Sequence, residues 1–180
     1  DGHAKRNEGG KPSCVDFYES SSGKFLKSVQ VRFEAHTMAI DRTNNRLLIG
    51  NGGDGSFSVI DLKNKELTNT FRVCSSAEEV IYDKNTKNLY ILNRLAGSEI
   101  YRYNISTGNF DTVIAGIWPV DMAFSPARKK LYVMSHYEAK IYVINTEKFE
   151  VVEEINLGII GSKTDTMSYM AFNDKTGILA

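Results

Sequence analysis

One pattern of apolar and polar positions returns along the chain at a nearly fixed spacing. A short apolar run that ends in Asp, Asn or Ser is followed by a polar turn and then by a second, almost wholly apolar run. The spacing between copies is 42 residues twice and then 48, and the first runs are Met38–Asp41, Val80–Asp83, Met122–Ser125 and Met170–Asn173. A period in this range, with several short strands in each unit, is typical of a β-propeller.

The second repeat shows how one unit is expected to fold. Two of its runs are almost continuously apolar, which predicts strands that are buried on both faces near the propeller axis. The other two alternate between apolar and polar residues, as outer strands with one wetter face should. The four strands are expected over residues 78–83, 88–93, 98–104 and 110–115. The sequence therefore predicts an all-β fold of four-stranded antiparallel blades, about 42 residues each.

The repeats divide the chain into three whole blades and two half blades behind an N-terminal tail. The two halves can pair into one composite blade and close a four-bladed ring. Alternatively, the chain is one arc of a larger propeller with about six to eight blades, and the regular strands favour this interpretation because a four-bladed ring is strongly curved. The expected segments are a tail over 1–13, a half blade over 14–32, blades over 33–73, 74–115 and 116–158, and a half blade over 159–180.

Composition and charge exclude several function classes. Lys and Arg balance Asp and Glu at 22 each, so no net field favours nucleic acid or an anionic membrane. No apolar run is long enough to predict a membrane span. The chain starts at Asp1 without Met or an apolar leader, so we expect a processed chain or a fragment.

The two cysteines, Cys14 and Cys74, indicate no cofactor chemistry. Neither has a CxxC partner or a CxxCH haem-attachment motif, so we expect this chain to carry no cofactor, while the cofactor of a partner chain stays open. A disulfide between the two is possible but not favoured, because they are expected about a blade apart and a disulfide needs Cα atoms within about 7 Å.

The third blade carries a more specific pattern. A start with Trp118-Pro119 precedes a turn, a strand with Leu131-Tyr132-Val133 and a strand with Ile144-Asn145-Thr146. This arrangement closely resembles the YVTN β-propeller repeat, and the match spans nearly all of residues 14–180. The chain departs from it at Ala35 and Ala77, which stand where the repeat has Pro, and by a six-residue excess around Gly161.

The resemblance implies a fold much more than a function. Proteins with similar repeats include heavy subunits of periplasmic amine dehydrogenases, propeller subunits of hydrazine synthase, the haem d1 domain of nitrite reductase and archaeal surface-layer proteins. The resemblance therefore implies a periplasmic or extracellular protein, often one subunit of an oxidoreductase complex.

Propellers bind their ligands at the axial mouth, on the connections between blades and between second and third strands. Glu79 and Asp121 are metal candidates there because oxygen ligands suit a hard cation such as Ca²⁺; alternatively they cap strand starts by accepting backbone N–H groups. Trp118 either wedges between blades or forms an interface hot spot. We expect no catalytic residue. The binding candidates are His36, Thr37, Asn51, Asp54, Glu78, Glu79, Asn93, Arg94, Trp118, Asp121, Ser135, His136 and Tyr169.

Three functional hypotheses follow. The first is a non-catalytic exported scaffold that presents a face to a protein partner or to the remaining propeller blades. The second is the propeller part of a periplasmic redox enzyme whose haem or quinone is carried by another chain. The third is a lactonase-like hydrolase with a metal at the axis, which would use Glu79, Asp121 and Asn93.

Overall fold

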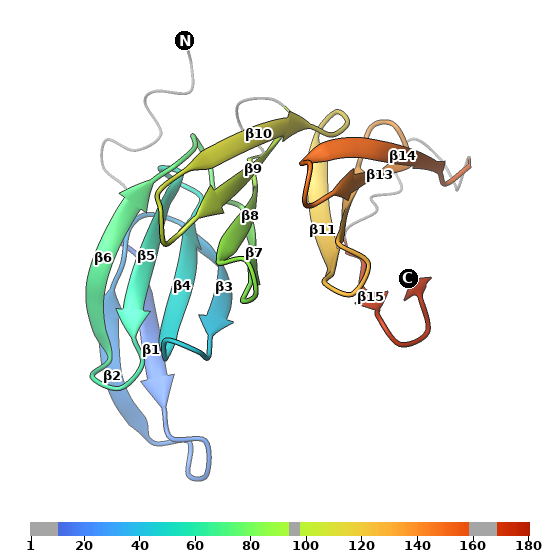
Figure 1. Cartoon of the computed structure of the whole chain (residues 1–180). Coiled ribbons are helices and arrows are strands. Elements are labelled where there is room, and N and C mark those ends of the chain that lie inside the picture. The colour runs from blue at the N-terminus through green and yellow to red at the C-terminus, as the bar shows by residue number, and fades with distance from the viewer. Residues whose placement is uncertain (1–10, 94–97, 159–168) are drawn as a thin grey trace.

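The computed structural model describes residues 11–93, 98–158 and 169–180, and the regular elements among them are all β-strands (Figure 1). Twelve of the strands form three antiparallel sheets of four, the blades one, two and three. In each sheet, strands that follow one another in sequence are neighbours. The strands are β3 (Ala35–Asp41), β4 (Arg46–Asn51), β5 (Ser56–Asp61) and β6 (Glu66–Arg72); β7 (Glu79–Asp83), β8 (Asn88–Leu92), β9 (Glu99–Asn104) and β10 (Phe110–Ile114); and β11 (Pro119–Ser125), β12 (Lys130–Ser135), β13 (Lys140–Asn145) and β14 (Glu150–Asn156).

The remaining strands form one two-stranded sheet at each end of the described chain. The first pairs β1 (Cys14–Tyr18) with β2 (Phe25–Gln30), and the last pairs β15 (Phe172–Asn173) with β16 (Ile178–Leu179). The fold class is therefore confirmed as all-β, with four-stranded antiparallel propeller blades flanked by two half sheets. No helix among the described residues is long and apolar enough to cross a membrane.

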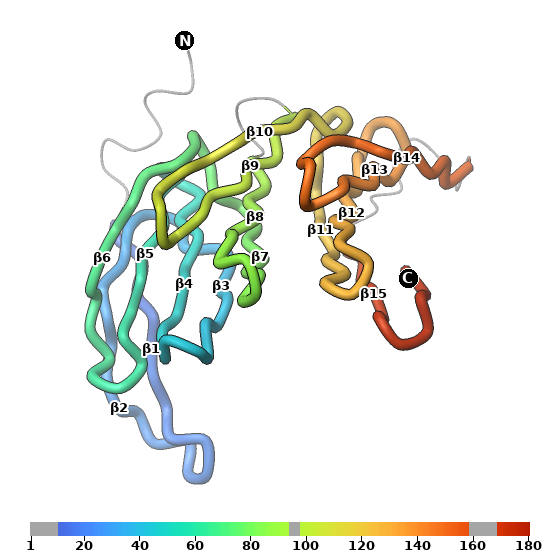
Figure 2. The backbone as a smooth tube through the Cα atoms, viewed as in Figure 1, coloured from blue at the N-terminus to red at the C-terminus, as the bar shows by residue number. Residues whose placement is uncertain are grey.

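The blades follow one another along an open arc (Figures 1 and 2). β1 lies at one end of the arc and β15 at the other, and no extensive contact joins the two half sheets. The described residues do not close a ring, so the total number of blades stays a prediction.

The hairpin turns explain why Asp or Asn ends so many strands. In the first turn of blade two, the Asp83 carboxylate accepts the N–H of Asn85 at 3.0 Å, and the Asp83 C=O accepts the N–H of Lys87 at 2.9 Å. Lys87 has a left-handed backbone with φ 64°, which only a minority of non-Gly residues adopt. The matching positions of the other first turns are also left-handed: Asn45, Lys129 and Gly177. The repeat in the sequence is therefore a repeat of capped turns.

The core lies between blades rather than within one sheet. The side chains of β8 are almost completely buried, because one face of the strand packs on blade one and the other on blade three. The ring of Tyr90 lies 5.2 Å from that of Phe124 and 6.3 Å from that of Phe149, both in blade three. This burial on two faces removes the apolar–polar alternation from the inner strands.

Both cysteines are free thiols, Cys14 exposed and Cys74 buried. Burial raises the pKa of Cys74 to about 12, so this side chain stays protonated and behaves as a small core residue.

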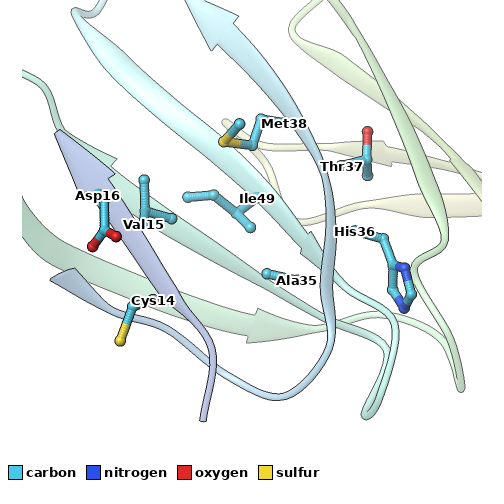
Figure 3. A pocket seen from close by; sticks show the side chains of 8 residues that line it. All are labelled: Cys14, Val15, Asp16, Ala35, His36, Thr37, Met38 and Ile49. Carbon is cyan, nitrogen blue, oxygen red and sulfur yellow. The ribbon is translucent and has the colours of Figure 1, made fainter. Parts of the chain in front are cut away.

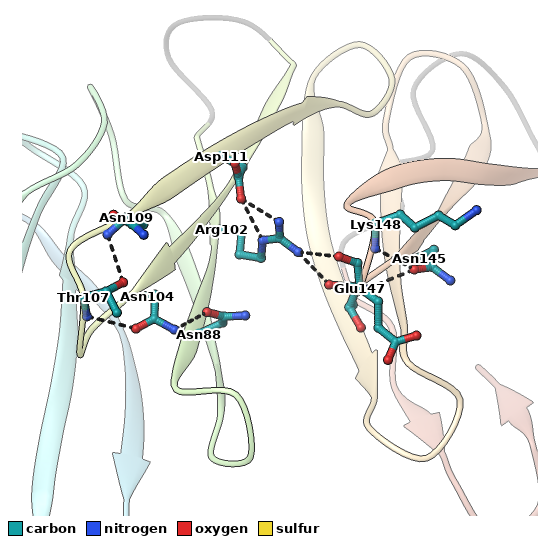
Figure 4. Close-up of polar contacts among 10 residues, drawn as sticks. Asn88, Arg102, Asn104, Thr107, Asn109, Asp111, Asn145, Glu147 and Lys148 are labelled. Atoms are coloured by element: carbon teal, nitrogen blue, oxygen red, sulfur yellow. Dashed lines mark hydrogen bonds and ion pairs between the residues drawn. The ribbon is translucent and has the colours of Figure 1, made fainter.

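Polar side chains join each blade to the next, and the contact surface between two blades is called a seam below. In the seam between blades one and two, the Tyr82 hydroxyl donates to the Asp41 carboxylate at 3.1 Å. In the seam between blades two and three, Arg102 donates to the C=O groups of Thr146 at 2.8 Å and Glu147 at 3.1 Å (Figure 4). These bonds hold β9 of blade two against the third turn of blade three.

Replacement of Arg102 by Met is expected to lower the free energy of unfolding by about 1–2 kcal/mol. The substitution keeps an apolar stem over the Phe149 ring, which lies 4.6 Å from the guanidinium carbon, but it removes both bonds across the seam. Urea unfolding monitored by circular dichroism measures the change. Asp111→Asn is the control, because the Arg102–Asp111 ion pair lies on the exposed side of Arg102 and should contribute less than about 0.5 kcal/mol. Equal midpoints for the two variants would show that the seam bonds contribute nothing.

Candidate functional site

The predicted mouth residues lie where the connections between blades meet the loops between second and third strands. The structure places three of them at equivalent positions at the ends of β4, β8 and β12, and all three are buried: Asn51, Asn93 and Ser135. Arg94 lies outside the described residues.

Two of these three residues fasten the connection that precedes the first strand of their own blade. The Asn93 side-chain oxygen accepts the Ser75 hydroxyl at 2.9 Å and the Ser76 N–H at 3.1 Å. The Ser135 hydroxyl accepts the Ile117 N–H at 3.1 Å and lies 2.8 Å from the Ile117 C=O. Both residues therefore hold the loops of the mouth in place.

Asn51 and Asp54 hold the second loop of blade one instead. The Asn51 amide donates to the hydroxyls of Ser56 at 3.1 Å and Ser58 at 3.0 Å. Asp54 accepts the Ser56 N–H at 3.1 Å and forms an ion pair of 2.7 Å with the Arg32 side chain. Both side chains are buried; the Asp54 carboxylate is occupied by these bonds, whereas the side-chain oxygen of Asn51 has no hydrogen-bond partner among the described residues.

His36 lies exposed on β3 between two acidic side chains. Its Nε2 atom is 3.9 Å from the Glu34 carboxylate and 3.8 Å from the Glu78 carboxylate. Glu78 also accepts the Ser76 hydroxyl at 2.7 Å. His36 and Glu78 occupy equivalent positions of neighbouring blades, so the contact between these two side chains crosses the seam between blades one and two.

Glu79 and Asp121 occupy the next equivalent pair of positions, and each binds the following blade. Glu79 Oε2 accepts the Met122 N–H at 2.8 Å, and Asp121 Oδ2 accepts the Met170 N–H. Burial and the negative charge of Asp121 raise the pKa of Glu79 to about 8, and burial also raises the pKa of Asp121. Two buried carboxyl groups in contact share one proton, because the cost of ionising both is high.

This arrangement gives the two acids a visible structural role as caps of neighbouring strands. Among the described residues, no group of three or more His, Cys, Asp or Glu side chains is placed to hold a metal ion. Metal binding at Glu79 and Asp121 thus stays a prediction with two protein ligands of the kind that Ca²⁺ uses.

The other predicted mouth residues are Trp118, His136, Tyr169 and Thr37. Trp118 and His136 lie on neighbouring loops of blade three, and Tyr169 is almost fully exposed. Thr37 pairs with Gly50 in the ladder between β3 and β4. Thr37 and His36 also line a pocket of about 200 Å³ between β1 and β3 (Figure 3), whose other lining residues are Cys14, Val15, Asp16, Ala35, Met38 and Ile49.

Sequence reasoning missed a second pocket, of about 260 Å³, on the opposite end of the seam between blades two and three. Arg102, Phe124 and Thr146 contribute to its lining. The hydroxyl of the buried Tyr90 has no hydrogen-bond partner among the described residues, and burial raises the pKa of Tyr90. Only the three-dimensional pairing of neighbouring repeats brings these residues together.

Comparison with known proteins supports the fold alone. No protein-family model matches the sequence, so the YVTN resemblance stays a prediction, and no curated protein sequence is significantly similar. Among solved structures, a chain of hydrazine synthase from Kuenenia stuttgartiensis is similar with a TM-score of 0.68 at 18% sequence identity. The match covers 79% of this chain and 42% of that chain, so the chain spans less than half the length of this structural neighbour. Similarity extends to 1036 solved chains in all, so the fold is too common to specify a function.

Proposed function

We propose that this chain is a non-catalytic arc of a β-propeller that acts as a protein-interaction scaffold and receives further propeller strands from outside the described residues. The single observation that carries the proposal is the exposed face of β3 in blade one, on the side where a preceding blade would pack. Met38 is 61% exposed, whereas its equivalents Val80 and Met122 are 5% and 3% exposed. Val80 is covered by blade one, close to Gly50 on β4. The strands that would cover Met38 in the same way are absent from the two-stranded sheet of β1 and β2.

The pocket beside β3 lies where the same covering strands would pack. It lies between β1, which has no partner strand on its inner edge among the described residues, and the exposed face of β3 (Figure 3). Ile40, two residues along from Met38, is 49% exposed. An apolar strip beside a free strand edge is stabilised by the addition of strands from a propeller blade, which bury the strip and complete the ladder.

Met38→Asp is expected to abolish the natural assembly and to leave the isolated chain as stable as before, because the side chain is exposed in the chain alone. The measurement is the native mass of the assembly isolated from its source cells, with the bound chains identified. Val152→Asp is the matched control, since Val152 is similarly exposed at 49% but lies on the outermost strand of blade three. A wild-type chain that is isolated only as a monomer, or an assembly that survives Met38→Asp, would contradict the proposal.

The similarity to the hydrazine synthase chain favours a second candidate, in which the arc belongs to a periplasmic redox complex and another chain carries the haem or quinone. Its support is the fold. Haem staining and visible absorption of the subunits that co-purify with the chain test it. A colourless assembly with no haem or quinone in any subunit would contradict this second candidate.

A further inference from the structure

Blade three exposes a group of large apolar side chains at the mouth, here called the Trp118 patch: Ile117, Trp118 and Tyr137. Their exposed fractions are 57%, 45% and 68%. The rings of Trp118 and Tyr137 lie 5.9 Å apart at an angle of 77°, so that they meet edge to face. The patch therefore offers two aromatic surfaces that are nearly perpendicular to each other.

The backbone beneath the patch is firmly held. The Ile117 N–H donates to the Glu138 carboxylate at 2.7 Å, and the Trp118 C=O accepts the His136 N–H at 3.1 Å. Gly116 packs so closely that a Cβ atom there would lie 2.5 Å from the Ser135 Cβ atom. A loop held in this way loses little backbone freedom when it binds a partner, which favours affinity.

The choice of Trp at this position is unusual in backbone terms. Trp118 has φ 57°, in the left-handed region that bulky residues rarely adopt. The equivalent residue of blade one, Glu34, is also left-handed with φ 52°, but Ser76 of blade two is not, so the repeat tolerates this backbone without demanding it. A Gly or Asn would adopt this backbone more easily, so an aromatic residue at this strained and exposed position points to binding.

The chemistry of the patch selects the kind of partner. The three side chains of the patch carry no charge. The Glu138 carboxylate beside them is turned toward the Ile117 N–H, Lys140 forms an ion pair with Glu154 at 2.7 Å, and the His136 ring lies 5.3 Å from the Tyr137 ring. Neither the Trp118 indole N–H nor the Tyr137 hydroxyl donates to another residue that the structure describes. An uncharged aromatic surface with two such donors suits a polyproline II segment, whose rings are apolar and whose C=O groups have no internal partners.

We propose that the Trp118 patch binds a proline-rich segment of a partner protein in the polyproline II conformation. This inference extends the proposed scaffold function, but it uses a surface on blade three rather than the exposed face of blade one. Its test needs only the chain and a peptide, so its failure is distinguishable from a failure of the assembly measurement.

The chain contains a single Trp, so its fluorescence reports directly on the patch. Titration with a decaproline peptide is expected to give a saturable change with a dissociation constant below about 1 mM. A Gly–Ser peptide of the same length should give none. Tyr137→Ala, which keeps the reporter, should weaken binding at least about fivefold, or by roughly 1 kcal/mol. Tyr18→Ala is the matched control and should bind as the wild type does, since Tyr18 is 57% exposed but lies on β1, outside the patch.

A second variant separates binding from folding. Trp118→Asn is expected to fold with unchanged circular dichroism, because Asn accepts the left-handed backbone, and to show no binding of decaproline by calorimetry. The proposal is overturned if decaproline gives no saturable change, if the Gly–Ser peptide binds equally, or if Tyr137→Ala or Trp118→Asn binds like the wild type. A response to lipid vesicles or oligosaccharides without a response to decaproline would assign the patch to another class of partner and would also overturn it.

Discussion

Replacement of Tyr90 by Ala is expected to lower the free energy of unfolding by about 3–5 kcal/mol. The Tyr90 side chain is completely buried, and its ring packs against Phe124 and Phe149 across the seam between blades two and three. Its loss leaves a cavity that the sheets on either side cannot close, because both are fixed by their own ladders. The midpoint of urea unfolding measures the change.

Tyr90→Phe is the control for this result. It keeps the ring and removes a buried hydroxyl that has no hydrogen-bond partner among the described residues. An unpaired buried hydroxyl costs free energy, so this variant should be as stable as the wild type or more stable by about 1 kcal/mol. A loss of more than about 1 kcal/mol in Tyr90→Phe would show that the hydroxyl, and not the ring, holds the seam together.

The stability of the chain is expected to fall by about 2–4 kcal/mol as the pH rises from about 5 to 8. The reason is Glu79, whose pKa is raised from its ordinary value of 4.5 to about 8 in the folded chain by burial and by the Asp121 carboxylate. Between these two values the unfolded chain has released the proton and the folded chain still holds it. The unfolded state therefore gains relative to the folded state, and the contribution of the shared proton is fully present only below about pH 4.5.

Glu79→Gln should remove this dependence. The amide oxygen can still accept the Met122 N–H, and the amide N–H can donate to Asp121 as the protonated acid does. Unfolding free energies of the variant and the wild type are expected to converge near pH 4 and to separate toward pH 8, where the variant is the more stable. Glu78→Gln is the control, because Glu78 binds the Ser76 hydroxyl and not Asp121. A Glu79→Gln profile parallel to that of the wild type would contradict the shared proton.

The blades were predictable because their inner strands are buried on both faces, which leaves continuous apolar runs such as Leu89–Leu92 between capped turns. The limits of the strands agree with expectation to within one or two residues; β7, for example, begins at Glu79 rather than at residue 78. The number of blades was not predictable, because the closure of a ring depends on strands that pair over long distances.

The roles of the candidate residues were less predictable than their positions. The repeat alone predicts equivalent positions for Asn51, Asn93 and Ser135, and in the structure they lie at the ends of β4, β8 and β12, while their part in binding stays a prediction. Whether such a side chain meets a ligand or a backbone group depends on neighbours that the period does not reveal, as the bond between Asn93 and Ser76 illustrates. The left-handed backbone of Lys87 could not be predicted either, because this position has Lys rather than Gly.

The seams have a consequence for how a protein of this kind can change its number of blades during evolution. Two junctions share one contact, a carboxylate on a backbone N–H for Glu79 and Asp121. Each junction also has a bond of its own: a phenol on a carboxylate for Tyr82 and Asp41, a guanidinium on two carbonyl groups for Arg102, and a hydroxyl on a carboxylate for Ser125 and Asp174. A duplicated or transposed repeat would keep its sheet, but it would meet a neighbour without the matching group. We therefore expect that gain of a blade by gene duplication would need new substitutions on both sides of the insertion.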